Sequence, residues 1–150
     1  MIIGLHHPGI VVPDLAKAIE FYCEVLEFKV FKKMEWQAPS PIMDQITGLT
    51  HSSAKVCLLK GPNCYLELFE FKSNSSASSQ TAYDADKLGL RHLAFQVSDV
   101  AAVLSKLQAC GGQVMNQPAT VKGGGTGVYS RDPFGNLIEF TTAKGRFPSL

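Results

Sequence analysis

Apolar residues recur at helical spacing twice along the chain, and the two occurrences are 85 positions apart. Both follow the i, i+3, i+4, i+7 pattern of a helix that is buried on one side. The positions are Leu15, Ala18, Ile19 and Tyr22 in the first copy, and Val100, Val103, Leu104 and Leu107 in the second. Asp14 and Asp99 precede these stretches, where an N-cap accepts a hydrogen bond from the first turn. The sequence therefore predicts an internal repeat.

Shorter apolar stretches bounded by turn residues predict strands around each helix. The first strand of each half begins at His7 and at His92, and the later strands are expected at 28–36, 54–60, 64–71, 112–116, 125–131 and 137–142. Each half thus reads as β-α-β-β-β, which predicts an α+β fold in one domain, 1–150. We expect module 1 at about 1–71, a serine-rich linker at about 72–88 and module 2 at about 89–143. An insert at 37–53 is expected to carry a short helix, 42–49, over a pocket.

Composition narrows the class of protein. Fourteen Lys and Arg against 13 Asp and Glu leave a net charge of +1 over 150 residues. This near-neutral net charge argues against a protein that binds nucleic acid or anionic membranes through a broad basic surface. No apolar run approaches the roughly 20 residues of a membrane-spanning helix, and no leader is recognised, so a cytoplasmic location is expected. The four cysteines show no CxxC spacing, which makes a zinc knuckle or a disulfide framework unexpected.

Two histidines and two glutamates occupy matched places in the repeat. His7 and His92 open the two halves, and Glu67 and Glu139 stand between apolar neighbours in the last strand of each. If those neighbours pack against the helices, alternation turns both glutamates to the opposite face of the sheet. An unpaired carboxylate there is costly. A divalent metal held by all four side chains would satisfy them.

Imidazole and carboxylate ligands suit Ni, Co, Zn, Mn or Fe(II) better than a thiolate-seeking ion. Four protein ligands leave two positions of an octahedral ion for water or substrate. An ion with open positions polarises a carbonyl, or holds an enediolate while a proton moves. The expected partner is a small-molecule substrate.

At these motifs the chain resembles the vicinal oxygen chelate superfamily, from about residue 5 to 142. The resemblance rests on four residues and the motifs around them: His7 in HHPGIVVPDL, Glu67 in YLELFEF, His92 in RHLAFQVSDV and Glu139 in DPFGNLIEF. The resemblance implies paired βαβββ modules that form a half-open, strongly curved mixed β-barrel around the metal, with the helices outside. The His, Glu, His, Glu order is similar to that of bacterial glyoxalase I and of methylmalonyl-CoA epimerase.

The resemblance implies a metal-dependent lyase or isomerase that acts on a small carbonyl compound or thioester through an enolate-type intermediate. Glu139 or Glu67 would carry the proton, and the choice between them is open. A homodimer is expected by analogy with the superfamily. Glu67 is followed by Leu68-Phe69-Glu70, whereas glyoxalase I usually has a segment there that contacts glutathione. This departure argues against glutathione as the substrate.

Two other functions stay open. One is Fe(II)-dependent extradiol ring cleavage with Glu67 outside the metal's ligands, and the other is a metal-free protein that sequesters a drug or metabolite. His6 and His51 are interpreted as solvent-facing or supporting groups. The glycine-rich segment 123–127 lacks the Lys-Ser/Thr of a phosphate loop and is interpreted as a hairpin near the pocket. Aromatic and thioether side chains are expected either to line an apolar cavity or to pack in the core: Tyr65, Phe69, Met34 and Trp36.

Overall fold

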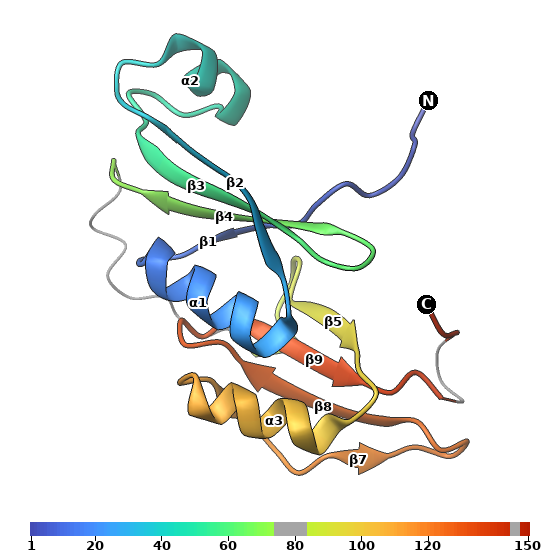
Figure 1. Ribbon diagram of the computed structural model, residues 1–150. Helices are drawn as coiled ribbons and strands as arrows, with labels where there is room; N and C mark the ends of the chain where they lie inside the picture. The colour runs from blue at the N-terminus through green and yellow to red at the C-terminus, as the bar shows by residue number, and fades with distance from the viewer. Residues whose placement is uncertain (74–83, 145–147) are drawn as a thin grey trace. The chain divides into compact units, whose positions relative to one another are not determined.

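The computed structural model describes residues 1–73, 84–144 and 148–150. It divides into two compact units, Met1–Ser79 and Gln80–Leu150, each taken by itself below (Figure 1). Unit 1 contains β1 (Gly9–Val11), α1 (Leu15–Leu26), β2 (Lys29–Trp36), α2 (Pro41–Thr47), β3 (Ala54–Lys60) and β4 (Tyr65–Phe71). Unit 2 contains β5 (His92–Gln96), α3 (Val100–Ala109), β6 (Gln113–Val114), β7 (Ala119–Thr120), β8 (Thr126–Arg131) and β9 (Leu137–Thr141).

Both repeat helices begin at the predicted aspartates. The Asp14 carboxylate accepts a hydrogen bond from the Lys17 amide at 2.9 Å, and the Asp99 carboxylate accepts one from the Ala102 amide at 3.0 Å. The predicted stripes are confirmed where the structure buries them: Leu15, Ala18 and Tyr22 in α1, and Val100, Val103, Leu104 and Leu107 in α3. Burial of one face supplies most of the stability of such short helices.

The sheet of unit 1 has the strand order β1-β4-β3-β2. β1 runs parallel to β4, and the other two pairings are antiparallel. Leu66 and Leu68 of β4 are fully buried on the sheet face that α1 covers. Alternation along β4 therefore sends Glu67 to the other face, as the sequence predicts.

The sheet of unit 2 repeats this topology, with the order β5-β9-β8-β6 and with β7 paired to β8. β5 runs parallel to β9. The turn between β8 and β9 is held by buried Asp132, which accepts hydrogen bonds from the Phe134 and Asn136 amides at 2.9 and 2.8 Å. All five residues of β9 are buried.

The α+β class and the repeated βαβββ order are confirmed, and neither sheet closes on itself within the described residues. The strand expected at 112–116 is shorter, and β7 is not predicted by the sequence. Pro118, which has no N–H to donate to a ladder, stands between the end of β6 and the start of β7. Of the expected linker, residues 74–83 lie outside the described residues. No helix in the described part of the chain is long and apolar enough to cross a membrane.

The insert of unit 1 forms α2, slightly earlier than the expected 42–49, and projects beyond the ends of β2 and β3 (Figure 1). Asp44 ties it back to the sheet, because its carboxylate accepts hydrogen bonds from the His51 amide and from both the amide and the hydroxyl of Ser52. The Ser52 hydroxyl in turn accepts a hydrogen bond from the Trp36 indole at 3.0 Å. These bonds link the insert to the last residue of β2.

Removing either helix cap should destabilise the chain. We expect Asp14→Ala and Asp99→Ala each to lower the free energy of unfolding by about 1 kcal/mol, because an amide of the first turn loses its acceptor. Asp14→Asn and Asp99→Asn are the controls, since asparagine caps equally well. Urea unfolding monitored by circular dichroism measures the effect. Alanine variants as stable as the asparagine variants would contradict the capping role.

The hydrogen bonds at Asp44 hold the pKa of its carboxyl below the ordinary value, with the Ser52 hydroxyl as the largest cause and the backbone amides adding to it. Because the Asp44 pKa is lower in the folded state, the ionised carboxylate stabilises the fold at pH values above the unfolded-state pKa of about 3.9. This stabilisation is lost as the pH falls through the folded-state pKa of Asp44. We expect Ser52→Ala to raise the Asp44 pKa toward its ordinary value in an NMR titration. Ser53→Ala is the control. An unchanged Asp44 pKa in Ser52→Ala would refute the assignment.

Candidate metal centre

In unit 1, His7 and Glu67 lie side by side. The Glu67 amide donates a hydrogen bond to the Pro8 carbonyl at 3.0 Å, and Glu67 is in register with Gly9 of β1. This parallel pairing places the segment just before β1, which contains His7, next to the middle of β4. The distance from His7 Nε2 to Glu67 Oε2 is 3.0 Å, and both side chains are partly exposed.

In unit 2, His92 and Glu139 form the matching pair. Glu139 is in register with Ala94 of β5 and with Tyr129 of β8. His92 Nε2 lies 3.2 Å from Glu139 Oε2, and the His92 ring packs edge-on against the Tyr129 ring. Glu139 is only 5% exposed, so this carboxylate is more deeply enclosed than its counterpart in unit 1.

The four side chains that the sequence singles out are therefore brought together as two pairs, one in each unit. Among the described residues, no group of three or more histidine, cysteine, aspartate or glutamate side chains is gathered that could hold a metal ion. Each pair alone supplies one imidazole nitrogen and one carboxylate oxygen.

The spacing within each pair fits two ligands of one ion. Two donor atoms bound at about 2.1 Å and at right angles lie about 3.0 Å apart. The observed separations of 3.0 and 3.2 Å match this value. The donors are the nitrogen and oxygen types that Zn, Ni, Co, Mn and Fe(II) accept. The residues present therefore fit a divalent metal in donor type, and their spacing is equally that of a hydrogen-bonded imidazole–carboxylate pair.

His6 supports His7. Their Nδ1 atoms lie 2.7 Å apart in a hydrogen bond, which leaves Nε2 of His7 directed at Glu67. The His6 ring stacks on Tyr65, with the ring centroids 5.1 Å apart and the planes 10° from parallel. Strand alternation would place His6 and His7 on opposite faces, but both residues precede β1, so that rule does not apply to them. A hydrogen bond of this kind orients a ligating imidazole.

Cysteine is not part of either pair. Burial raises the pKa of Cys23, Cys57 and Cys64 above the ordinary thiol value. A raised pKa disfavours the thiolate form that binds metal. The donor chemistry of the candidate centre is therefore nitrogen and oxygen.

The face of unit 1 that carries Glu67 also carries an aromatic cluster. Trp36, Phe69 and Phe71 pack together there, with ring centroids 5.6 to 6.5 Å apart. The strand register places Met34 on the same face as Phe69, through Val56. The aromatic residues that the sequence indicates thus flank the Glu67 side of the sheet and not its helix-covered side.

A cavity of about 240 Å³ lies beside Glu139 within unit 2. Its walls come from the glycine-rich hairpin between β7 and β8, from β9 and from the segment before β7. The glycine-rich segment is a hairpin, in which the Val121 amide donates to the Gly125 carbonyl at 2.8 Å. The interpretation of 123–127 as a hairpin near a pocket is confirmed. The polar residues Asn116 and Gln117 on this wall are not identified by the sequence, because they stand outside any periodic stretch.

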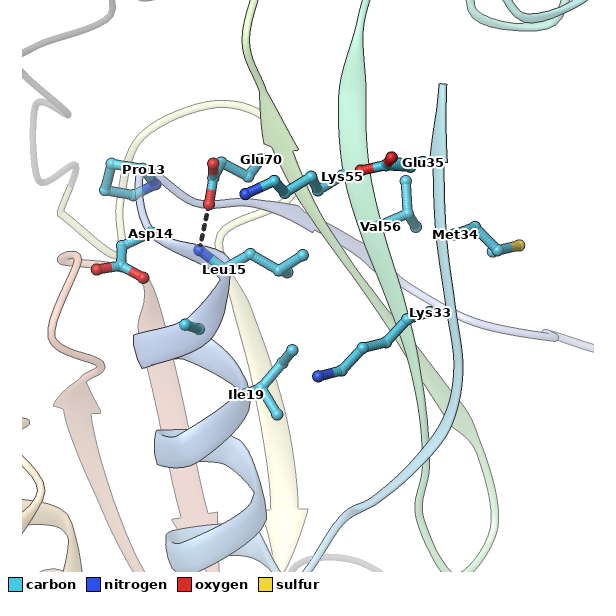
Figure 2. Close-up of a pocket in the computed structure, with 11 residues that line it drawn as sticks. Pro13, Asp14, Leu15, Ile19, Lys33, Met34, Glu35, Lys55, Val56 and Glu70 are labelled. Atoms are coloured by element: carbon cyan, nitrogen blue, oxygen red, sulfur yellow. Dashed lines mark hydrogen bonds between the residues drawn. The ribbon is translucent and has the colours of Figure 1, made fainter. Parts of the chain in front are cut away.

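A larger cavity, about 720 Å³, lies in unit 1 between α1 and the sheet. Figure 2 shows Lys55 and Glu70 directed from the strands toward the beginning of α1, where Glu70 accepts a hydrogen bond from the Leu15 amide, and Lys33 directed toward Ile19. Glu70 and Glu67 are three positions apart in β4, so their side chains point to opposite faces of the sheet. This cavity therefore opens on the face opposite to the His7–Glu67 pair. It is not part of the candidate metal centre.

Comparison with known proteins gives the same fold and family. The chain is 31% identical over 144 residues to a 2-epi-5-epi-valiolone epimerase of Actinomyces sp., covering 91% of this chain and 78% of the relative. It is 32% identical over 129 residues to a lactoylglutathione lyase of Arabidopsis thaliana, covering 85% of this chain. The chain spans only 40% of the length of that plant relative.

A crystal structure of a glyoxalase family protein from Bacillus cereus superposes with a TM-score of 0.85 over 94% of both chains, at 20% identity, which shows a shared fold. The family model that describes the Glyoxalase/Bleomycin resistance protein/Dioxygenase superfamily matches residues 4–140, nearly the whole chain. The duplicated βαβββ units and the family match agree, and this chain belongs to the Glyoxalase/Bleomycin resistance protein/Dioxygenase superfamily.

Proposed function

We propose that this protein is a metal-dependent lyase or isomerase that acts on a small carbonyl compound or thioester. Relatives named epimerase and lactoylglutathione lyase support a glyoxalase-like activity in general terms. The observation that carries the proposal is the repeat of one His–Glu pair in each unit, at 3.0 and 3.2 Å. Two such pairs at matched positions are what a shared cation requires.

His7, Glu67, His92 and Glu139 are the ligands that we propose for one ion, supplied by a single chain or by two chains of a dimer. When bound, the ion supplies Lewis acidity that polarises the carbonyl of a substrate and makes the neighbouring C–H bond more acidic. His7 is oriented for this task by the hydrogen bond between its Nδ1 and Nδ1 of His6, in which a metal-binding His7 would be the donor. The pairing of Glu67 with His7 favours the four-residue ligand set over an extradiol site with Glu67 outside it.

Glu139 is the group that we propose moves the proton. One of its oxygens, Oε2, faces His92, and the other, Oε1, lies beside Gly127 at the wall of the 240 Å³ cavity. A C–H bond of the substrate breaks, its proton passes to Oε1, and the electron pair is delocalised onto the carbonyl oxygen. Return of the proton to the same carbon or to a neighbouring one gives epimerisation or isomerisation. A positioned carboxylate contributes about 10²- to 10⁴-fold to such a step.

Metal content gives the first test. Protein purified without chelator should contain about one divalent ion per chain by elemental analysis, if the four proposed ligands share one ion. His92→Ala should reduce that content strongly, and His51→Ala, in the insert, serves as the control. Wild-type protein that stays metal-free and still binds a ligand tightly would point instead to a sequestering protein.

Proton abstraction can be tested with a hydroxyketone such as 1,3-dihydroxyacetone in D₂O, where NMR follows deuterium entering the carbon beside the carbonyl. We expect Glu139→Gln to slow the exchange by about 10²-fold or more, because an amide does not accept the proton. Glu20→Gln, an exposed change on α1, is the control. Exchange at the wild-type rate in Glu139→Gln would reject its role. Oxygen uptake with catechols after anaerobic Fe(II) loading would instead favour a dioxygenase.

A further inference from the structure

We propose that the cavity beside Glu139 binds an uncharged, hydroxyl-bearing part of the substrate. The inference rests on the proposed function, and it names the substrate class as a polyhydroxy ketone or aldehyde with no carboxylate or phosphate at this end. The cavity lies entirely within unit 2, between the β7–β8 hairpin, β9 and the segment at 116–117.

The size of the cavity limits the ligand. Its volume is about 240 Å³, roughly eight times the 30 Å³ that one water molecule occupies in the liquid. Ligand pockets for drug-sized molecules usually measure about 300–1,000 Å³. The cavity therefore suits a single sugar-sized ring or an open-chain fragment.

The charge of the wall excludes anionic groups. Among the described residues that line the cavity there is no lysine, arginine or histidine, and Glu139 is the one charged side chain. A carboxylate or phosphate entering here would lose its hydration without gaining a cation. It would also approach the negative charge of Glu139 in a region of low dielectric. The wall therefore selects against the anionic ends of glutathione and of phosphorylated metabolites.

The polar groups on the wall match hydroxyls instead. Asn116 and Gln117 supply amide groups that both donate and accept hydrogen bonds. The Thr141 hydroxyl accepts a hydrogen bond from the Ala143 amide at 3.2 Å, so its own hydrogen is available to a ligand oxygen. Ala119 and Val121 give the same wall an apolar part. This mixture fits a ring that has hydroxyls on its edge and C–H groups on its faces.

Gly127 opens the cavity to the carboxylate. A Cβ atom at this position would lie 3.6 Å from Glu139 Oε1, which is ordinary van der Waals contact. The backbone does not require glycine here, because the φ angle of Gly127 is not in the positive, left-handed range. A side chain at 127 is therefore sterically tolerable, but it would stand between the ligand and Oε1. Gly127 thus sets how closely the ligand approaches the proposed base.

The test is an NMR titration of metal-free protein with two probes of similar size, the uncharged ring ketone 2-keto-myo-inositol and the carboxylate glucuronate. Removing the metal prevents either probe from binding through an ion. We expect the ketone to shift the amide signals of Gly127 and Thr141 saturably, and glucuronate to bind at least tenfold more weakly. Equal or tighter binding of glucuronate, or no saturable shift with the ketone, would overturn the proposal.

Variants locate the binding. Gly127→Val should weaken binding of the ketone at least tenfold by filling the cavity, whereas Ala101→Val, which adds similar bulk on the exposed face of α3, should leave it unchanged. Gln117→Lys should strengthen glucuronate binding at least tenfold. Ketone affinity unaffected by Gly127→Val would overturn the site. Binding of the ketone without any deuterium exchange in the metal-loaded protein would reject the proposed function and leave this inference standing.

Discussion

The parallel pairing of the first and last strands in each unit is the constraint on which the candidate centre depends. In unit 1 the residue two positions after His7 is in register with Glu67, and in unit 2 the residue two positions after His92 is in register with Glu139. The same offset therefore produces the same imidazole–carboxylate contact twice. Parallel neighbours need a crossover connection, and the capped helices α1 and α3, with the antiparallel strands that follow them, provide it.

Burial distinguishes the two pairs chemically. Glu139 belongs to a strand whose five residues are all buried, whereas Glu67 is flanked by partly exposed aromatic rings. An enclosed carboxylate depends more strongly on its partner, because water does not compensate its charge. This difference supports Glu139 as the group at the reacting carbon and Glu67 as a group that holds the ion. The superfamily membership is compatible with several chemistries, so the side chains of the site must identify the reaction.

Much of this arrangement could be predicted from the sequence, because it follows from periodicity. The aspartate caps, the helical stripes and the direction of Glu67 all come from spacings of 3.6 and 2 residues. Three features could not be predicted: the wall formed by Asn116 and Gln117, the hydrogen bond between His6 and His7, and the short strand β7. They lie in irregular backbone, where no repeat fixes the direction of a side chain. The same holds for the Asp44–Ser52 bonds, whose partners are eight residues apart in an insert.

The residues that face the two glutamates across the antiparallel neighbour strand differ: Leu58 stands opposite Glu67, and Tyr129 stands opposite Glu139. The two units therefore share the same strand register but differ in the side chain that stands opposite each glutamate. An aliphatic side chain thus faces one carboxylate across the sheet, and a phenol ring faces the other. The two halves share a backbone frame, but each gives its carboxylate a different cross-strand neighbour, so the copies are alike in architecture and unequal in chemistry.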